Sequence, residues 1–479
     1  MFRTGFIIIH DRSDRKLTTA FTLSQELQRH LAGRSLLLSE IPFPLELIES
    51  HKKQGLITEQ PGIIQSTFTF ICQRCGNQHP SLFASFPCAH CGKTSIYCRK
   101  CIMMGRVATC TPLFNWIGPE PEIVVSQSPL RWNGALSSGQ EVAAQEVVEA
   151  IRHSSEHLVW AVCGAGKTEI LFRGINEALQ SGKRICIATP RTDVVLELAP
   201  RLQQVFPTTK VAALYGGSPD RHVYAPLTIT TTHQLYRFQH AFDVMIVDEV
   251  DAFPYTYDQT LQYAVQKAAK KQCAHIYLTA TPNEAWQREC RSGKRSFTTI
   301  PARFHRQPLP VPDFRWIGNW RKQLAKGNIP HRLERWIKQH LIAKKQALLF
   351  LPNIHLMNTI LPMMQIFHHA IESVHAEDPD RKSKIENMRT KQIPILLTTT
   401  ILERGVTISN IDVAVIGAED DIFTEAALVQ IAGRVGRSAQ FPSGEITFFH
   451  YGRSRAMVQA KQHIMNMNRE ARRRGLLDE

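Results

Sequence analysis

The sequence has 479 residues, 57 Lys and Arg against 42 Asp and Glu, and a formal net charge of +15. Its 43% hydrophobic content excludes disorder as the main state, and its length predicts about three domains. No apolar run approaches the roughly 20 residues that span a bilayer, and the N-terminus lacks a signal-peptide pattern, so we expect a cytoplasmic chain. In that compartment, the eleven cysteines favour metal ligands or reduced core residues over disulfides.

Seven of the eleven cysteines gather between residues 67 and 111. Six of them have C-x2-C spacing: Cys72 with Cys75, Cys88 with Cys91, and Cys98 with Cys101. Two such pairs complete a tetrahedral zinc site, and an all-thiolate site is closed and structural. The sequence therefore predicts a zinc module over residues 66–112, with reduced structural cysteines as the alternative.

The three pairs offer more thiols than one zinc ion uses. Either one pair stands apart, or a second metal recruits Cys110 or a histidine such as His90. The spacing leaves this choice open. Ahead of the module, residues 1–65 carry a mixed helix and strand pattern without a chemical motif, and we assign them no role.

After the cysteines, short β-branched runs alternate with helical patterns, which is typical of a parallel sheet covered by helices. The first predicted strands are residues 184–188, 228–232, 244–247 and 275–278, with a helix at 169–180. A second set follows at residues 346–351, 393–398, 413–417 and 445–450. The prolines between the sets indicate an interdomain link: Pro308, Pro310 and Pro312. We predict an α/β fold with two lobes, at residues 113–305 and 306–479.

Much of the positive charge is concentrated near this link. Fifteen Lys and Arg and only three Asp and Glu lie between residues 287 and 345, together with aromatic residues such as Trp316, Trp320 and Trp336. Cations attract phosphates and aromatic rings stack on unpaired bases, so the segment is a candidate path for a nucleic-acid strand. The alternative is a solvated charged face with core aromatics.

Residues 161–168 spell AVCGAGKT after an apolar run and before a helical pattern. This is a phosphate-binding loop with Ala in place of its first Gly. Gly164 and Gly166 let backbone N–H groups surround phosphates, Lys167 neutralises the β and γ oxygens, and the Thr168 hydroxyl meets Mg²⁺. The motif predicts a nucleotide site.

An apolar strand ending in acids follows at residues 245–251. Acids at the carboxyl end of a parallel strand lie beside such a loop, where Asp248 would hold Mg²⁺ through water and Glu249 would orient or deprotonate the attacking water. The missing cation could come from the second lobe, since residues 430–437 spell QIAGRVGR and offer Arg434 and Arg437 as arginine fingers.

Together these segments resemble the motifs of superfamily 2 helicases and translocases. The matching stretches are residues 161–168, 189–191, 248–251, 279–281, 398–407 and 430–437. The resemblance implies RecA-like lobes and ATP binding by Gln140 at the adenine, by Gly164, Ala165, Gly166, Lys167, Thr168 and Glu169, by Asp248 and by Gly405. It also implies that Thr279 and Thr281 couple hydrolysis to lobe movement, and that Arg404 links strand and nucleotide.

A narrower resemblance is to the ComFA competence family, through the cysteine module ahead of the motor and the stretches at residues 232–255, 398–407 and 430–438. It implies a cytoplasmic ATPase at the inner face of the membrane, with single-stranded DNA, a ComFC-like protein and a membrane channel as partners, and a possible homo-oligomer. In that family the constant pairs match Cys72/Cys75 and Cys98/Cys101. The pair Cys88/Cys91 departs from this pattern.

The sequence thus predicts an ATP-dependent single-stranded DNA translocase that uses ATP, Mg²⁺ and Zn²⁺ and serves uptake of transforming DNA. The alternatives are a replication-restart helicase resembling PriA, an RNA helicase, and an ATP-switched scaffold that recruits DNA-uptake partners without translocation.

Overall fold

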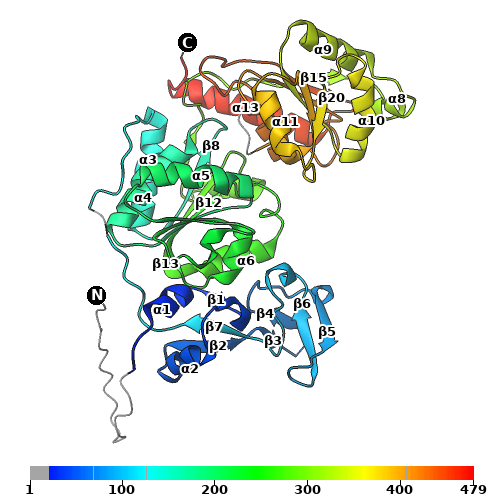
Figure 1. Ribbon diagram of the computed structural model, residues 1–479. Helices are drawn as coiled ribbons and strands as arrows, with labels where there is room; N and C mark the ends of the chain where they lie inside the picture. Colours follow the sequence, from blue (N-terminus) through cyan, green and yellow to red (C-terminus); the bar gives the residue numbers. More distant parts are fainter. Residues whose placement is uncertain (1–20, 68, 126, 405–407, 479) are drawn as a thin grey trace, which may run out of the picture.

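A computed structural model describes residues 21–67, 69–125, 127–404 and 408–478. Figure 1 shows an N-terminal part in blue, a central lobe in cyan to green (lobe 1) and a C-terminal lobe in yellow to red (lobe 2). Each lobe contains a parallel sheet flanked by helices, so the predicted α/β class with two tandem lobes is confirmed. No helix in the described ranges is long and apolar enough to cross a membrane.

The N-terminal part is built on a three-stranded antiparallel sheet with the order β1-β7-β2. Its elements are α1 (Gln25–Leu31), β1 (Ser35–Leu36), α2 (Leu45–Lys53), β2 (Ile57–Pro61) and β7 (Pro112–Trp116). The cysteine module is inserted between β2 and β7, with β3 (Ile63–Gln65) on β4 (Phe70–Cys72) and β5 (Phe83–Pro87) on β6 (Thr94–Cys98). The predicted boundary at residue 112 therefore cuts through β7, which pairs back with β1 and β2 and lies outside lobe 1.

Lobe 1 is a seven-stranded parallel sheet with the order β10-β11-β9-β12-β13-β8-β14. Its elements are α3 (Ser138–Arg152), β8 (Glu156–Ala161), α4 (Lys167–Gln180), β9 (Ile185–Thr189), α5 (Thr192–Val205), β10 (Val211–Leu214), β11 (Leu227–Thr231), β12 (Phe242–Asp248), α6 (Gln259–Ala268), β13 (Ala269–Thr279), α7 (Glu284–Arg291) and β14 (Phe297–Ile300). All four strands predicted for this lobe are present. Because the strands are parallel, the loops after β8 and β12 emerge at the same edge.

The buried His157 of β8 makes the stability of lobe 1 depend on pH. Its ring nitrogens contact Ser296 Oγ at 2.8 Å and Thr298 Oγ1 at 3.0 Å, and burial lowers its pKa from 6.5 to about 4. Between about pH 6.5 and pH 4, His157 is protonated in the unfolded chain but neutral in the folded chain. The free energy of unfolding therefore falls as the pH is lowered from 6.5 to about 4. His157→Asn should remove up to about 3 kcal/mol of this pH dependence in urea unfolding at pH 7 and pH 4.5. Equal pH dependence in both proteins would contradict the assignment.

Lobe 2 is a six-stranded parallel sheet with the order β15-β20-β19-β16-β18-β17. Its elements are β15 (Asp313–Trp316), α8 (Trp320–Ala325), α9 (His331–Ile342), β16 (Ala347–Phe350), α10 (Ile354–Gln365), β17 (Glu372–Val374), α11 (Arg381–Arg389), β18 (Ile395–Thr398), β19 (Asp412–Ile416), α12 (Glu425–Ala432), β20 (Ile446–His450) and α13 (Arg455–Arg473). The predicted proline link runs between β14 and β15. Helix α13 holds it, since Asn468 exchanges two hydrogen bonds with the backbone of Leu309.

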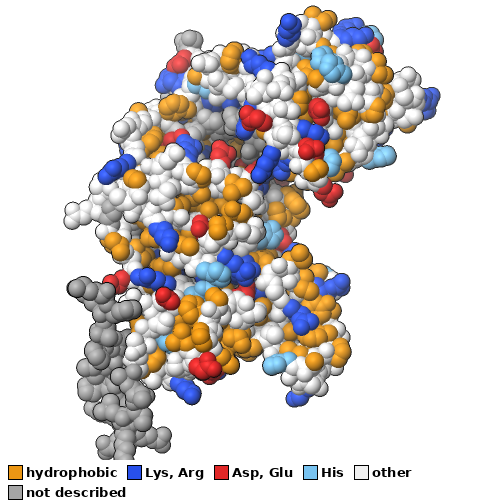
Figure 2. All heavy atoms as spheres, viewed as in Figure 1, with side chains coloured by type: hydrophobic (Ala, Val, Ile, Leu, Met, Phe, Trp, Pro, Cys, Tyr) orange, Lys and Arg blue, Asp and Glu red, His pale blue; other side chains and the backbone are white. Residues whose placement is uncertain are grey.

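The basic segment at residues 287–345 does not form one surface. It runs from α7 through the link to α8 and α9, and Trp320 and Trp336 are fully buried in the core of lobe 2. Arg295 pairs with Glu156, and Arg321 pairs with Asp420. On the face shown in Figure 2, basic side chains are spread over all three parts of the molecule. The aromatic residues are divided between core and surface, since Trp316 is 55% exposed, and several cations are paired with acids. The strand path along this segment therefore stays a prediction.

The cysteine module lies against helix α6 of lobe 1. Lys267 Nζ donates to the carbonyl of Arg74 at 2.6 Å, and Lys100 pairs with Asp258 at 2.7 Å. Gly76 packs so closely on Tyr263 that an added Cβ would lie 2.6 Å from the ring. The module thus rests on the helix that follows the acidic end of β12.

Candidate nucleotide site between the lobes

The loop after β8 has the backbone of a phosphate cradle. Gly164 and Gly166 adopt φ of 84° and 72°, values that side chains disfavour, and α4 begins at Lys167. A Cβ on Gly166 would lie 2.4 Å from Gln140 Nε2, so this position also lacks room for a side chain. The N-terminus of α4 and Lys167 together provide backbone donors and a cation for phosphate oxygens.

Gln140, the predicted adenine contact, is hydrogen-bonded to the phosphate-binding loop. Its side-chain oxygen accepts from Ser137 N at 2.8 Å, and its Nε2 donates to the carbonyl of Ala165 at 2.8 Å. The amide is therefore bonded to the phosphate loop, and its adenine contact stays a prediction. Glu169, also predicted at the nucleotide, pairs with Arg201 of α5.

The carboxyl end of β12 brings two acids to the same edge. Desolvation of the half-buried Asp248 raises its pKa to about 6, although the nearby Lys167 cation opposes the shift. Glu249 follows with φ of 55°, a left-handed backbone conformation that is uncommon for residues other than glycine. Its Oε2 is buried without a hydrogen-bond partner in the described ranges and lies 3.5 Å from Arg404 Nη1.

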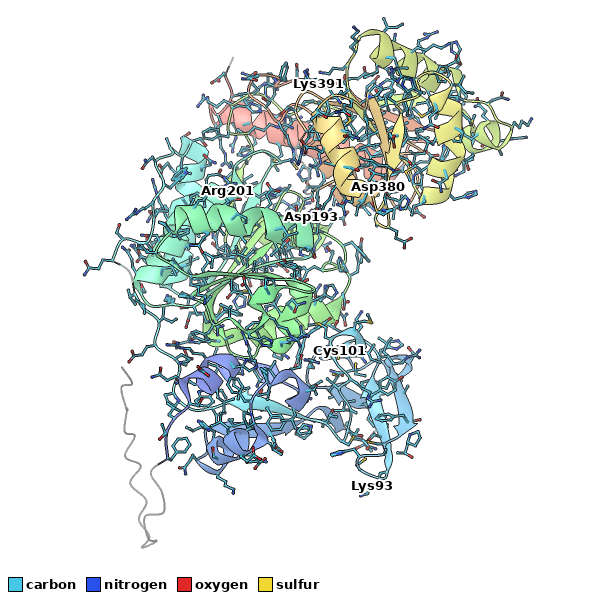
Figure 3. All side chains as sticks on the ribbon, in the orientation of Figure 1. Lys93, Cys101, Asp193, Arg201, Asp380 and Lys391 are labelled. Atoms are coloured by element: carbon cyan, nitrogen blue, oxygen red, sulfur yellow. The ribbon has the colours of Figure 1, made fainter. Side chains whose placement is uncertain are left out.

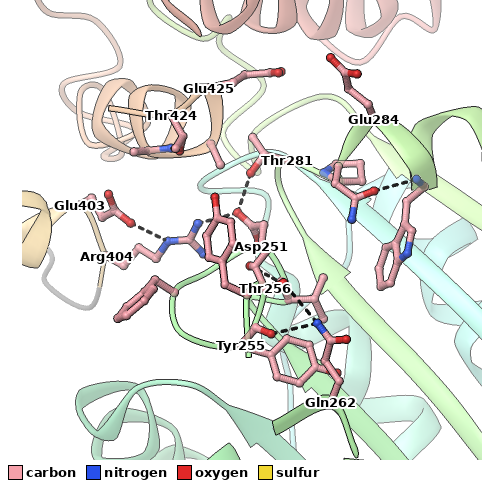
Figure 4. A pocket seen from close by; sticks show the side chains of 18 of the residues that line it. Asp251, Tyr255, Thr256, Gln262, Thr281, Glu284, Glu403, Arg404, Thr424 and Glu425 are labelled. Carbon is pink, nitrogen blue, oxygen red and sulfur yellow. Dashed lines mark hydrogen bonds and ion pairs between the residues drawn. The ribbon is translucent and has the colours of Figure 1, made fainter. Parts of the chain in front are cut away.

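Asp251 joins three segments from both lobes. It accepts from Thr279 Oγ1 at 2.7 Å and from Thr281 Oγ1 at 2.6 Å, and Arg404 Nη2 lies 2.5 Å away. Figure 4 shows Arg404 reaching this carboxylate from lobe 2. Although burial opposes ionisation, Arg404 and the two hydroxyls hold the pKa of Asp251 far below its usual range. Through Asp251, the hydroxyls of Thr279 and Thr281 in lobe 1 are connected to Arg404 in lobe 2. This is the kind of contact that the predicted coupling of hydrolysis to lobe movement requires. Gly405 lies outside the described residues.

A cleft of about 990 Å³ opens beside this network, lined by both lobes. Phe253 and Tyr257, from the loop after β12, line it and are 77% and 72% exposed. Large aromatic residues with this exposure are suited to stacking on a ligand.

The predicted arginine fingers lie in a segment that packs on the phosphate loop. Cys163 Sγ donates to Gln430 Oε1 at 3.0 Å, and a Cβ on Gly433 would lie 2.6 Å from Cys163 Cβ. Arg434 is buried, and its Nε donates to the carbonyl of Glu403 at 3.0 Å. Arg437 Nε donates to the carbonyl of Gly433 at 2.9 Å. The structure thus brings the segments of Lys167 and of Arg434 together across the lobes.

Arg303 is a further residue of this site that sequence reasoning missed. It is 1% exposed, its side chain packs on Gly164, and its Nη1 donates to the carbonyl of Gly436. Its Nε and Nη2 are buried without a hydrogen-bond partner in the part of the chain that the structure describes. Phe304 N also donates to the carbonyl of Gly164 at 3.1 Å. In the sequence, Arg303 is distinguished only as one of the fifteen cations of the basic segment.

Arg303→Ala should lower the ATPase rate by about tenfold to a hundredfold, because it removes the contact that joins Gly164 to Gly436 and a buried cation beside the phosphate-binding loop. The matched control is Arg306→Ala, since Arg306 pairs with the exposed Asp478. Steady-state hydrolysis by the two variants is the measurement. If Arg303→Ala hydrolyses ATP as fast as Arg306→Ala does, Arg303 does not contribute to the nucleotide site.

The cysteine module divides the six predicted ligands. Cys72, Cys75, Cys98 and Cys101 are buried with their Sγ atoms within 4.8 Å of one another, a set of four thiols that fits a tetrahedral zinc ion. Cys88 and Cys91 lie outside this set and gather with Cys110. The spacing left open whether the extra pair stands apart or gathers with another residue, and the structure places Cys110 beside Cys88 and Cys91.

Comparisons with known families cover most of the chain. The model described as "Competence protein ComFA N-terminal domain" matches residues 18–115. "Type III restriction enzyme, res subunit" matches residues 133–284, and "Helicase conserved C-terminal domain" matches residues 331–439. The competence protein ComFA of Bacillus subtilis (strain 168) is 48% identical over 447 residues, which cover 93% of this chain and 96% of that relative. The chain belongs to the ComFA family.

A second ComFA protein, from Streptococcus pneumoniae strain R6, is 34% identical over 428 residues, covering 89% of this chain and 96% of the relative. Among solved structures, the Mycobacterium smegmatis helicase Lhr bound to ssDNA and AMP-PNP has a TM-score of 0.51 at 18% identity. The match covers 70% of this chain and 50% of that one. These findings confirm the resemblance to the ComFA family and the two-lobed superfamily 2 helicase fold.

Proposed function

We propose that this ComFA-family chain is an ATP-driven motor that moves along single-stranded DNA and serves the uptake of transforming DNA. The observation that carries the proposal is the contact of Asp251 with Arg404, which ties the acidic end of β12 to lobe 2. A nucleotide site completed by both lobes makes hydrolysis depend on how the lobes are arranged.

In this mechanism, the backbone of residues 164–166 and Lys167 bind the phosphates of ATP. Thr168 and Asp248 fit the oxygen donors that Mg²⁺ prefers, and the ion when bound would neutralise charge on the β and γ phosphates. Glu249 orients the attacking water and accepts its proton. Arg434 and Arg437 stabilise the negative charge that develops on the γ-phosphate.

Loss of the γ-phosphate then weakens the hold of lobe 1 on lobe 2. Asp251 carries this change, since it contacts Thr279, Thr281 and Arg404 at once. The lobes separate and close again with each ATP, which shifts their grip on the strand. Phe253 and Tyr257 are the aromatic residues that we assign to the bases of that strand, because they are exposed beside the moving contact.

The proposal extends to cofactor, location and partners. The four buried thiols of the module take structural zinc, and the chain works in the cytoplasm at the inner face of the membrane. There it meets a ComFC-like protein and the DNA channel. Membership of the ComFA family supports this assignment, and the docking of the module on α6 places the module beside the motor.

Displacement of streptavidin from biotinylated single-stranded DNA tests the motor directly. The wild type with ATP should clear the block, whereas Lys167→Ala should leave it bound. ATP hydrolysis that single strands stimulate without any displacement would contradict translocation and favour the scaffold. A strong preference for forked DNA over plain single strands would favour a replication-restart helicase.

A further inference from the structure

Cys88, Cys91 and Cys110 form a cluster separate from the four buried cysteines. The ligand atoms of the three lie within 4.8 Å of one another, and Cys88 Sγ is 3.6 Å from Cys110 Sγ. Cys91 and Cys110 are partly exposed, in contrast to the buried set. We propose that the three cysteines bind a second zinc ion, in a site with three protein thiolates and a fourth position that faces solvent.

The backbone around Cys88 repeats that of the first site. At Cys72, the backbone N donates to Asn77 O at 3.1 Å, and Gly76 N donates to Cys72 O at 2.8 Å. At Cys88, the backbone N donates to Lys93 O at 3.0 Å, and Gly92 N donates to Cys88 O at 2.9 Å.

The glycines of the two turns also agree, with φ of 71° at Gly76 and 67° at Gly92. Two turns with the same sequence spacing, the same hydrogen bonds and the same left-handed glycine hold their paired thiols in the same way. Because the first turn presents Cys72 and Cys75 to a tetrahedral set, the second turn is equally prepared to present Cys88 and Cys91 to a metal.

The third thiol is brought in by the chain just before β7. Thr109 N donates to Ile96 O at 2.9 Å, which holds this segment against β6. Ser95, which is 2% exposed, lies beneath the cluster with its Oγ 3.6 Å from Cys91 Sγ, and it accepts from Thr109 Oγ1 at 3.4 Å. Cys110 is therefore held beside the turn through the contacts of Thr109 with Ile96 and Ser95 of β6.

The two clusters lie in different parts of the module. Figure 3 shows Cys101 at the end that faces lobe 1, and Lys93 of the second turn at the opposite, outer end. Three soft thiolates select zinc over the oxygen-preferring cations, and zinc completes its tetrahedron with a fourth donor. Solvent exposure at the outer end leaves that position to water. This site is independent of the proposed motor activity.

Zinc content of the full-length, reduced protein tests the proposal. After passage over a chelating resin, elemental analysis should give about two zinc ions per chain for the wild type and about one for Cys88→Ser and for Cys110→Ser. Cys290→Ser is the matched control with two ions, because Cys290 lies in α7, outside the module. Cobalt substitution adds a second readout, since thiolate-to-cobalt absorbance should fall in Cys110→Ser.

One zinc ion in the wild type, with the same content in Cys88→Ser and Cys110→Ser, would overturn the second site. So would a disulfide between Cys88 and Cys110 in protein purified under reducing conditions, detected by peptide mass. His90→Ala should keep two ions. Loss of one ion from that variant would overturn the open fourth position. The one ion that Cys88→Ser and Cys110→Ser retain reports that the four buried cysteines of the module are still assembled.

Discussion

Glu249→Gln should lower the ATPase rate by about 10² to 10⁴ while leaving nucleotide affinity nearly unchanged. The substitution keeps the shape of the side chain but removes the group that takes a proton from the attacking water. The carboxylate is suited to this role because it follows β12 in a left-handed conformation, and its Oε2 has no hydrogen-bond partner in the described ranges. Single-turnover hydrolysis together with a fluorescent-nucleotide binding assay separates the chemical step from binding.

Lys167→Ala is the matching variant for binding, since it should weaken nucleotide affinity as well as hydrolysis. Glu177→Gln is the control on the same helix, because Glu177 lies in the last turn of α4 and pairs with the exposed Arg152. A Glu249→Gln protein that hydrolyses ATP at more than about a tenth of the wild-type rate would exclude Glu249 as the base.

Arg404→Ala should nearly abolish hydrolysis stimulated by single-stranded DNA. Arg404 is 2% exposed, and its removal leaves the buried Asp251 without its cation. Breaking one side of a buried ion pair costs about 3 to 5 kcal/mol, and a cost of this size on the closed arrangement of the lobes predicts a loss of about 10² to 10⁴ in rate. The measurement is the ATPase rate at saturating DNA.

A double-mutant cycle with Asp251→Asn isolates the pair. The double variant should lose less than the sum of the single variants, with a coupling of about 0.5 to 3 kcal/mol. Arg455→Ala is the matched control, because Arg455 pairs with Glu284 across the same lobes but the two side chains are 78% and 61% exposed. Additive losses at Asp251 and Arg404, or an equal loss in Arg455→Ala, would contradict the role of the buried contact.

Sequence periodicity was sufficient for the two sheets because their strands are apolar runs between helical patterns. β12 and β19 show this clearly, since nearly all their residues are buried. The phosphate loop and the acids after β12 could also be predicted, because both sit at strand ends whose position in a parallel sheet is known from general rules.

Contacts between distant segments could not be predicted in the same way. β7 follows the inserted cysteine module, so its pairing with β1 and β2 carries no local signal. The packing of Arg303 on Gly164 depends on how the link leaves β14, and one charge among fifteen does not reveal it. The grouping of Cys110 with Cys88 is likewise set by the fold of the module, since Cys110 is not part of a C-x2-C pair.

In the basic segment at residues 287–345, the sequence pattern indicated a single surface that the folded chain does not form. Local charge indicated a strand path, but the pairing of charges is a property of the folded surface. Arg315 pairs with Glu445 and Arg321 pairs with Asp420, and both acids are distant in the sequence. The exposed aromatic residues Phe253 and Tyr257 beside the interlobe contact are now the better candidates for the strand.

The central claim is that a nucleotide site shared by both lobes drives movement on single-stranded DNA. The most direct test is the ATPase rate of the wild type with single-stranded DNA, duplex DNA, RNA and no nucleic acid, with Lys167→Ala as the inactive reference. We expect single-stranded DNA to give the largest increase and Lys167→Ala to show none. A wild-type rate that single-stranded DNA leaves at the level of the free protein would contradict the claim.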